Sequence, residues 1–138
     1  MELSINWLAV ITATVASMIV AGVWYQDWAL GLPWKKITNI DAKKADKAGN
    51  TPMMVVLIVN FFTAAVLAVV ISIVASYFNT SSLWLALGTG VGIWLAFSAT
   101  TLLTHNMFEQ KSFKLTLINN GYQLVMFVVM AFVIGLMQ

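Results

Sequence analysis

The residues with most capacity for chemistry are carboxamides and hydroxyls placed inside otherwise apolar stretches of the chain. Four of them, near the C-terminal end, are spaced at i, i+3, i+4 and i+7, which puts them on one face of a helix. They are Thr116, Asn119, Asn120 and Gln123. A carboxamide is costly in hydrocarbon unless it is hydrogen-bonded, so this face is expected to meet protein groups or water. Neighbouring apolar stretches carry further polar groups, namely Tyr25, Asn60, Thr63, Ser98, Thr101 and His105.

Two interpretations of these polar residues stay open. Any one of them is more typical of an interhelical hydrogen bond, which contributes about 0.6 kcal/mol on average. Taken together they favour a ligand-binding or permeation site, because the group is larger than the cohesion of short helices requires. The candidate ligand-binding residues are Tyr25, Asn60, Thr63, Thr101, His105, Asn119, Asn120 and Gln123.

Catalysis is a weaker interpretation. His105 is the only histidine, and imidazole is the side chain whose ordinary titration falls near neutral pH. A metal site is not expected, because there is no second histidine, no cysteine and no carboxylate within the apolar stretches. An enzyme could use His105, Tyr25 and Asn120 as acid–base and polarising groups, but no nucleophile or phosphate-binding loop stands out. We therefore predict no catalytic residue and no cofactor, and an enzyme remains an alternative.

The elements that must position these groups are four apolar segments without Lys, Asp or Glu. They cover about residues 7–25, 54–78, 83–104 and 115–137. Each is close to the ~20 residues that a helix needs to cross a bilayer. With 61% hydrophobic and 9% charged residues, the chain lies far outside the usual composition of soluble domains. We expect an all-α fold, an integral membrane four-helix bundle forming a single domain over residues 1–138.

The orientation follows from the lysines. All seven lie in the loops around residues 26–52 and 105–114, and the chain has no arginine. The positive-inside rule places these loops in the cytoplasm and both termini on the non-cytoplasmic side, as in a multi-pass protein of the bacterial inner (plasma) membrane. Residues 41–49 have the pattern of a short surface helix. Anionic lipid headgroups, and not nucleic acid, are the expected partners of Lys35, Lys36, Lys43, Lys44 and Lys47.

Small residues at intervals of four predict how the helices pack, because they let membrane helices approach closely. The first segment has Ala9, Ala13, Ser17 and Ala21; the second has Asn60, Ala64, Ala68, Ser72 and Ser76; the third has Gly88, Gly92, Ala96, Thr100 and Thr104. We expect each stripe to be a packing seam, with backbones touching at Gly92. Three seams exceed the need of one bundle, so a homo-oligomer, a dimer or trimer, is expected.

Several short motifs resemble one family. They are Asn6, Gly22-Val23-Trp24-Tyr25, Gly31 and Trp34, and Gly121-Tyr122-Gln123-Leu124-Val125. With them, nearly the whole chain resembles the domain-of-unknown-function family 1761, small four-span membrane proteins of bacteria and fungi. In relatives the Tyr tends to be followed by Ser-Pro, whereas Gln26-Asp27 follows here. The resemblance implies four helices and one domain, and it implies no activity.

Three functions are therefore compatible with the sequence. The one we favour is the binding or permeation of a small molecule or ion through a polar chamber that faces the cytoplasm in a homo-oligomer. The alternatives are a membrane-embedded enzyme acting on a lipid or hydrophobic substrate, and a structural or accessory membrane subunit.

Overall fold

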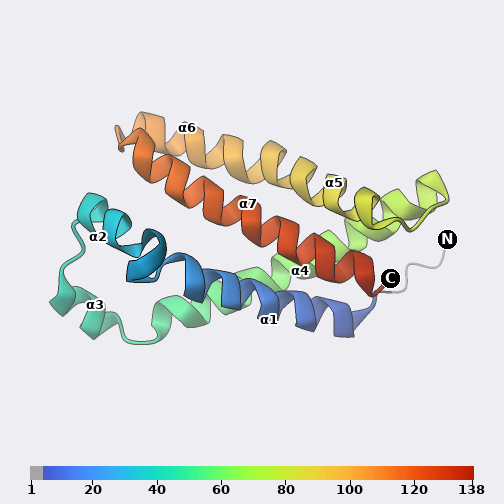
Figure 1. The fold of residues 1–138 in the computed structure, drawn as a ribbon, viewed down its shortest axis with the longest axis horizontal. Coiled ribbons are helices and arrows are strands. Elements are labelled where there is room, and N and C mark those ends of the chain that lie inside the picture. Colours follow the sequence, from blue (N-terminus) through green and yellow to red (C-terminus); the bar gives the residue numbers. More distant parts are fainter. Residues whose placement is uncertain (1–4) are drawn as a thin grey trace.

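A computed structural model describes residues 5–138, apart from the side chains of Ala42, Lys44 and Ala45, and this part of the chain contains helices and no strand. Four of the helices are long and apolar enough to cross a membrane, which confirms the predicted all-α class with four such segments (Figure 1). They are α1 (Trp7–Trp24), α4 (Thr51–Phe78), the continuous helix Leu83–Phe108 and α7 (Phe113–Leu136). The third of these consists of α5 (Leu83–Ile93), the π-helical segment η2 (Trp94–Ala99) and α6 (Thr100–Phe108).

The two ends of the molecule differ in composition. Both described chain ends and the turn between α4 and α5 lie at one end, which we call the terminal end (Figure 1). The other end carries α2 (Leu32–Thr38), α3 (Ala42–Ala48) and the turn between α6 and α7. All seven lysines belong to segments at this second end, so we call it the lysine end.

Polar residues set the limits of the long helices. Asn6, Ser82 and Ser112 each accept a hydrogen bond from the backbone N–H three residues further on, at 3.1–3.2 Å. Such side chains satisfy N–H groups that have no partner inside the helix. Asn79 ends α4 in a left-handed conformation with φ of 50°, which asparagine tolerates better than most residues. Each cap lies at a boundary between a loop and an apolar segment.

After α1 the chain turns sharply through η1 (Asp27–Gly31) into α2. Gly31 is buried, and a Cβ at this position would lie 2.3 Å from the carbonyl oxygen of Tyr25 and 2.7 Å from that of Gln26. Both neighbours are backbone atoms, which cannot move aside as a flexible side chain can. The turn therefore needs glycine because of the close approach of the chain to itself.

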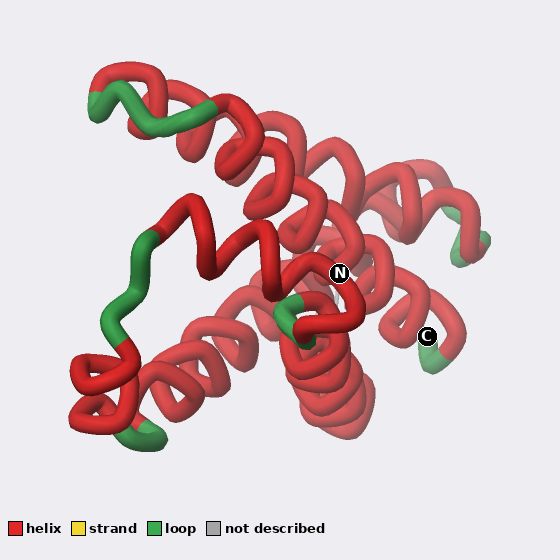
Figure 2. Tube along the Cα trace, turned by 60° about the vertical axis from the view of Figure 1, so that its left-hand side comes forward, coloured by secondary structure: helices red, strands yellow, loops and turns green. Residues whose placement is uncertain are grey.

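The short helix α3 stands apart from the four long helices, beside the start of α4 (Figures 1 and 2). It falls inside residues 41–49, where the sequence pattern favoured a surface helix. The Asp41 carboxylate caps it by accepting a hydrogen bond from the Lys43 N–H at 3.0 Å, and Gly49 ends it with φ of 54°. Lys43 and Lys47 are exposed on this helix, as Lys35 and Lys36 are on α2, whereas the side chain of Lys44 lies outside the description.

The packed core lies where α1, α4 and α7 meet. Its largest fully buried side chains are Val10, Leu67, Ile71, Met130 and Ile134, each at most 1% exposed. The small-residue stripes of the first two segments face this core. Its buried members are Ala9, Ala13, Ser17 and Ala21 on α1, and Asn60, Ala64 and Ala68 on α4. Close backbone approach through these small residues holds the helices together, as the spacing predicted. The predicted stripe of the second segment does not continue to its end, because Ser72 is only half-buried and Ser76 is exposed.

The predicted seam of the third segment is wrong. Gly88 and Gly92 are exposed, and a Cβ at either would meet nothing within 4 Å. The helix instead turns Ala86 and Gly90 towards α7. There a Cβ at Gly90 would lie 2.7 Å from the Ala131 Cβ, and a Cβ at Gly135 would lie 2.7 Å from the Ala86 Cβ. The chosen stripe was two residues out of register, because glycines at 88, 90 and 92 point to nearly opposite faces in turn.

The third helix also moves away from α4 towards the lysine end. The α5 part packs on both α4 and α7, whereas α6 packs on α7. Figures 1 and 2 show α4 and α6 diverging towards that end. The change occurs at η2, where the π-helical turn adds a residue and so alters the direction of the following side chains.

Candidate functional site

A hollow of about 430 Å³ lies between α4, the η2–α6 part of the third helix and α7. We call it the polar hollow because hydroxyl, carboxamide and imidazole groups from all three helices line it. These groups belong to Asn60, Thr63, Ser98, Thr101, His105 and Gln123. Its apolar walls include Phe97, Met126 and Phe127. Of the eight candidate ligand-binding residues, the structure brings together five here, namely Asn60, Thr63, Thr101, His105 and Gln123.

The polar groups of the hollow differ in how far they are already satisfied. Asn60 is 3% exposed, and its amide donates to the Ser17 hydroxyl of α1 at 3.0 Å. Thr63 donates to the Val59 carbonyl of its own helix at 2.9 Å. The other four polar side chains of the hollow form no hydrogen bond with any described residue. They are Ser98, Thr101, His105 and Gln123.

Hydrogen-bonding groups without protein partners are costly in hydrocarbon but not where water or a ligand reaches them. The four unbonded groups offer both donors and acceptors. The π-helical η2 supplies Phe97 and Ser98 to the same wall, and single π turns inside α-helices are frequent at functional sites. The geometry is that of an open recess and not of a closed hydrogen-bonded network.

Two predicted residues do not join the hollow because they bond each other elsewhere. The Tyr25 hydroxyl donates to Asn119 Oδ1 at 3.2 Å. The Tyr25 ring packs against the rings of Trp34 and Tyr122, with centroids 5.1 and 5.3 Å away. This pair ties the end of α1 to α7, which is the structural role weighed for each polar residue taken singly.

Asn120 is also not among the residues that line the polar hollow. Its Oδ1 is buried and, among the described residues, has no hydrogen-bond partner; the same is true of Trp94 Nε1. The proposed enzyme residues are therefore not assembled, because His105 lines the hollow while Tyr25 and Asn120 do not.

A buried polar residue that links two helices was missed in the sequence. Asn106 is 3% exposed, and its amide donates to the Thr116 hydroxyl at 3.0 Å, joining α6 to α7. It lies just beyond the predicted third segment, where an asparagine looks like part of a loop. The bond also accounts for Thr116, which is buried here and does not line the polar hollow.

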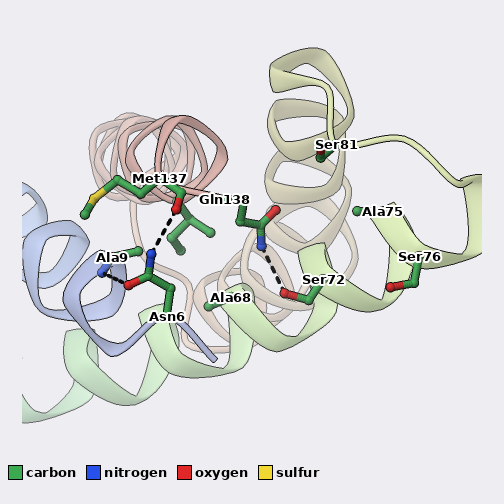
Figure 3. Close-up of a pocket in the computed structure, with 10 residues that line it drawn as sticks. Asn6, Ala9, Ala68, Ser72, Ala75, Ser76, Ser81, Met137 and Gln138 are labelled. Atoms are coloured by element: carbon green, nitrogen blue, oxygen red, sulfur yellow. Dashed lines mark hydrogen bonds between the residues drawn. The ribbon is translucent and has the colours of Figure 1, made fainter. Parts of the chain in front are cut away.

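A second hollow, of about 390 Å³, lies at the terminal end and was not predicted (Figure 3). Two of its polar side chains, Asn6 and Gln138, already form hydrogen bonds with other segments of the chain. The Asn6 amide donates to the Met137 carbonyl at 2.8 Å, and the Gln138 amide donates to the Ser72 hydroxyl at 3.0 Å. Figure 3 shows the first bond joining the start of α1 to the chain just after α7, and the second joining the last residue to α4. The hydrogen bonds of this terminal hollow therefore hold the two chain ends in place, and they leave fewer unbonded polar groups for a ligand than the polar hollow has.

Charged side chains gather at the lysine end and not in the polar hollow. Asp27 pairs with Lys35 at 2.7 Å, and Glu109 pairs with Lys111, while none of the described residues that line the polar hollow is a Lys, Asp or Glu. The hydrogen bond from Lys111, together with its charge, holds the pKa of the Glu109 carboxyl below its usual value. Within the described residues, no three His, Cys, Asp or Glu side chains gather in a way that could hold a metal ion.

The comparisons with known proteins add one assignment to this description. No curated protein and no solved structure matches the chain. A family profile described as "Protein of unknown function (DUF1761)" matches residues 8–135, which include all four long apolar helices almost entirely. The match confirms the family resemblance seen in the sequence. The chain belongs to the DUF1761 family.

Proposed function

We propose that this protein is an integral membrane protein that binds a small molecule bearing an uncharged polar group in the polar hollow. The observation that carries the proposal is that polar side chains from three helices converge there without bonding one another. Carboxamide, hydroxyl and imidazole groups can donate and accept hydrogen bonds, and within the described part of the chain the lining of the hollow includes no Lys, Asp or Glu. A few convergent polar groups in a largely apolar recess are typical of small-molecule sites.

The proposed orientation puts the polar hollow in the cytoplasmic half of the membrane. It is supported by the lysines, which all belong to one end of the molecule. The exposed Lys35, Lys36, Lys43 and Lys47 would then contact anionic headgroups of the cytoplasmic leaflet of a bacterial inner membrane. We assign Lys44 the same role from its place in the sequence.

Binding is favoured over passage through one protomer. Leu67, Ile71 and Met130 fill the middle of the molecule and are at most 1% exposed, so a solvated path would have to displace the packed core. A catalytic role has less support, because the residues considered for acid–base chemistry are not gathered at one place.

We also propose that the protein forms a homo-oligomer through the outer face of the third helix. The small residues of the predicted third seam are exposed there: Gly88, Gly92, Ala96, Thr100 and Thr104. Buried residues make up only 11% of the apolar stretch of this helix, against 28–39% in the other three. Small residues exposed at intervals of four allow close approach of a second helix in a membrane.

Thermal unfolding of the detergent-purified protein in the presence of lipids, quinones, ions and metabolites tests the binding proposal. A ligand should raise the unfolding temperature of the wild type and have little effect on Gln123→Leu or Thr101→Val. Tyr25→Phe is the matched control, because it removes a hydroxyl that lies outside the polar hollow. A ligand effect lost in Tyr25→Phe and kept in Gln123→Leu would place binding elsewhere.

A further inference from the structure

Beside the polar hollow lies a further recess, of about 470 Å³, along α4 towards the terminal end. We call this recess the apolar hollow. The two hollows share Thr63, Phe97 and Phe127 in their walls and so adjoin between α4 and the third helix, with α7 as their floor, and we call the pair the groove.

The chemistry of the groove changes along its length. Beyond the shared residues, the apolar hollow is lined by Phe62, Val66, Leu67, Val70 and Ile93, none of which has a hydrogen-bonding side chain. The polar hollow offers unbonded hydroxyl, carboxamide and imidazole groups at the opposite end of the same groove. A molecule that fits both parts must therefore be polar at one end and apolar at the other.

The groove is long and open to the side. Along α4 it extends from Val59 to Val70, which at 1.5 Å per residue is about 16 Å. Phe62, Val66 and Phe97 on its rims are 64%, 59% and 72% exposed. In a bilayer such rims contact lipid chains, so an apolar chain can enter the groove sideways from the membrane.

The charge of the polar end limits the kind of head group. Its lining, as far as the structure describes the chain, contains no Lys, Asp or Glu, and an ionised head group would be partly desolvated there without a charged partner. Hydroxyl or carbonyl groups, by contrast, find donors and acceptors in Thr101, His105 and Gln123.

We propose that the groove binds a single-chain amphiphile whose uncharged, hydrogen-bonding head lies in the polar hollow and whose chain lies in the apolar hollow. This inference rests on the proposed function and names the class of its ligand. The chain supplies apolar contact along α4, and the head sets the depth of the ligand in the membrane.

The protein contains its own control for ordinary lipid contact. Another recess, of about 340 Å³, lies between α1 and α4, and we call it the control recess. It is lined by Ile11, Val15, Leu57, Ile58 and Phe61, with Thr14. The Thr14 hydroxyl is already bonded to the Val10 carbonyl at 2.8 Å, so this control recess has no free polar end. Lipid chains that fill any surface depression should occupy it as readily as the apolar hollow.

The test uses the full chain in lipid nanodiscs and monolaurin with a diazirine at the end of its chain, followed by mapping of the adducts by mass spectrometry. We expect adducts at Val66, Val70 and Ile93 to exceed those in the control recess by about tenfold. The same chain carrying a phosphate head should label both recesses equally. Equal labelling by monolaurin would overturn the inference.

Three variants separate this inference from the proposed function. Val66→Trp should fill the apolar hollow and abolish its excess labelling, while Ile58→Trp, equally exposed on the same helix, should affect only the control recess. Gln123→Leu should also remove the excess. If Gln123→Leu suppresses thermal stabilisation by a small polar ligand while monolaurin labels both recesses equally, the polar site stands and the amphiphile does not. If excess labelling survives Gln123→Leu, the head group does not depend on the polar hollow and the amphiphile inference fails, while the thermal test still decides the proposed function.

Discussion

The packing of the third helix on α7 can be tested at Gly90, one of the two positions where a Cβ would lie 2.7 Å from a side chain of the other helix. In Gly90→Ala the new methyl group would lie 2.7 Å from the Ala131 Cβ and 3.2 Å from the Phe127 carbonyl oxygen. Carbon atoms in favourable contact are about 3.5–4.0 Å apart, so the helices must separate by about 1 Å. Overpacking of this kind costs about 1–3 kcal/mol. Alanine recovers up to about 1 kcal/mol in helix propensity, so the free energy of unfolding should fall by about 1–2 kcal/mol.

Gly92→Ala is the matched control, because its methyl group would meet nothing within 4 Å. It should leave the free energy of unfolding unchanged or raise it by up to about 1 kcal/mol. The double variant Gly90→Ala/Ala131→Gly moves one methyl group from α7 to α5 and removes the close contact. Its stability should exceed the sum of the single effects by about 1–3 kcal/mol.

The assay is reversible unfolding in mixed micelles, followed by circular dichroism as the fraction of denaturing detergent rises. Two results would refute the packing described here. One is an equal effect of Gly90→Ala and Gly92→Ala, which would mean that neither face is specific. The other is strict additivity in the double variant, which would mean that Gly90 and Ala131 do not touch.

Four further predictions concern the turn, the orientation, the outer face and the polar groups. Gly31→Ala should be strongly destabilising in the same unfolding assay, whereas Gly22→Ala should not, since a Cβ at Gly22 meets nothing within 4 Å. On the cysteine-free background, Asn39→Cys should be labelled only from the cytoplasm and Ser81→Cys only from outside; reversed labelling would invert the orientation. Gly92→Leu should leave the protomer folded but lower its oligomeric state in native mass spectrometry, and an unchanged oligomer would remove that interface. Asn106→Leu should cost about 1–3 kcal/mol because the buried Thr116 hydroxyl loses the hydrogen bond from Asn106, while Gln123→Leu should be nearly neutral; the reverse order would mean that the polar hollow is a bonded network.

The four long helices were predictable because a charge-free apolar run of bilayer length can adopt few structures other than a membrane-spanning helix. The stripes of α1 and α4 were also predictable, since each of these segments has one set of small residues at intervals of four. The third helix was ambiguous by contrast, because its glycines at 88, 90 and 92 allow more than one face. The choice depends on Ala131 and Gly135 of α7, and a pattern within one segment does not reveal its partner.

The polar residues of α7 have different roles, which a pattern within one segment also could not reveal. Spacing placed Asn119 and Gln123 on one face of α7, but a face is wide enough to touch two neighbours. Asn119 meets Tyr25 of α1, while Gln123 lies beside the opening between α4 and α6. Nor did the sequence reveal the divergence of these two helices, which leaves the recess open. Asn106 was overlooked because its partner Thr116 is brought near only by the turn between α6 and α7.

An experimental density map of the protein purified from native membranes into nanodiscs tests the polar hollow most directly. We predict ordered density between α4 and α6, with a polar end within hydrogen-bond distance of Thr101 or Gln123 and an extension towards Val66. Closed helices, with Asn60, Thr101, His105 and Gln123 bonded to one another in a dry interior, would contradict the binding function.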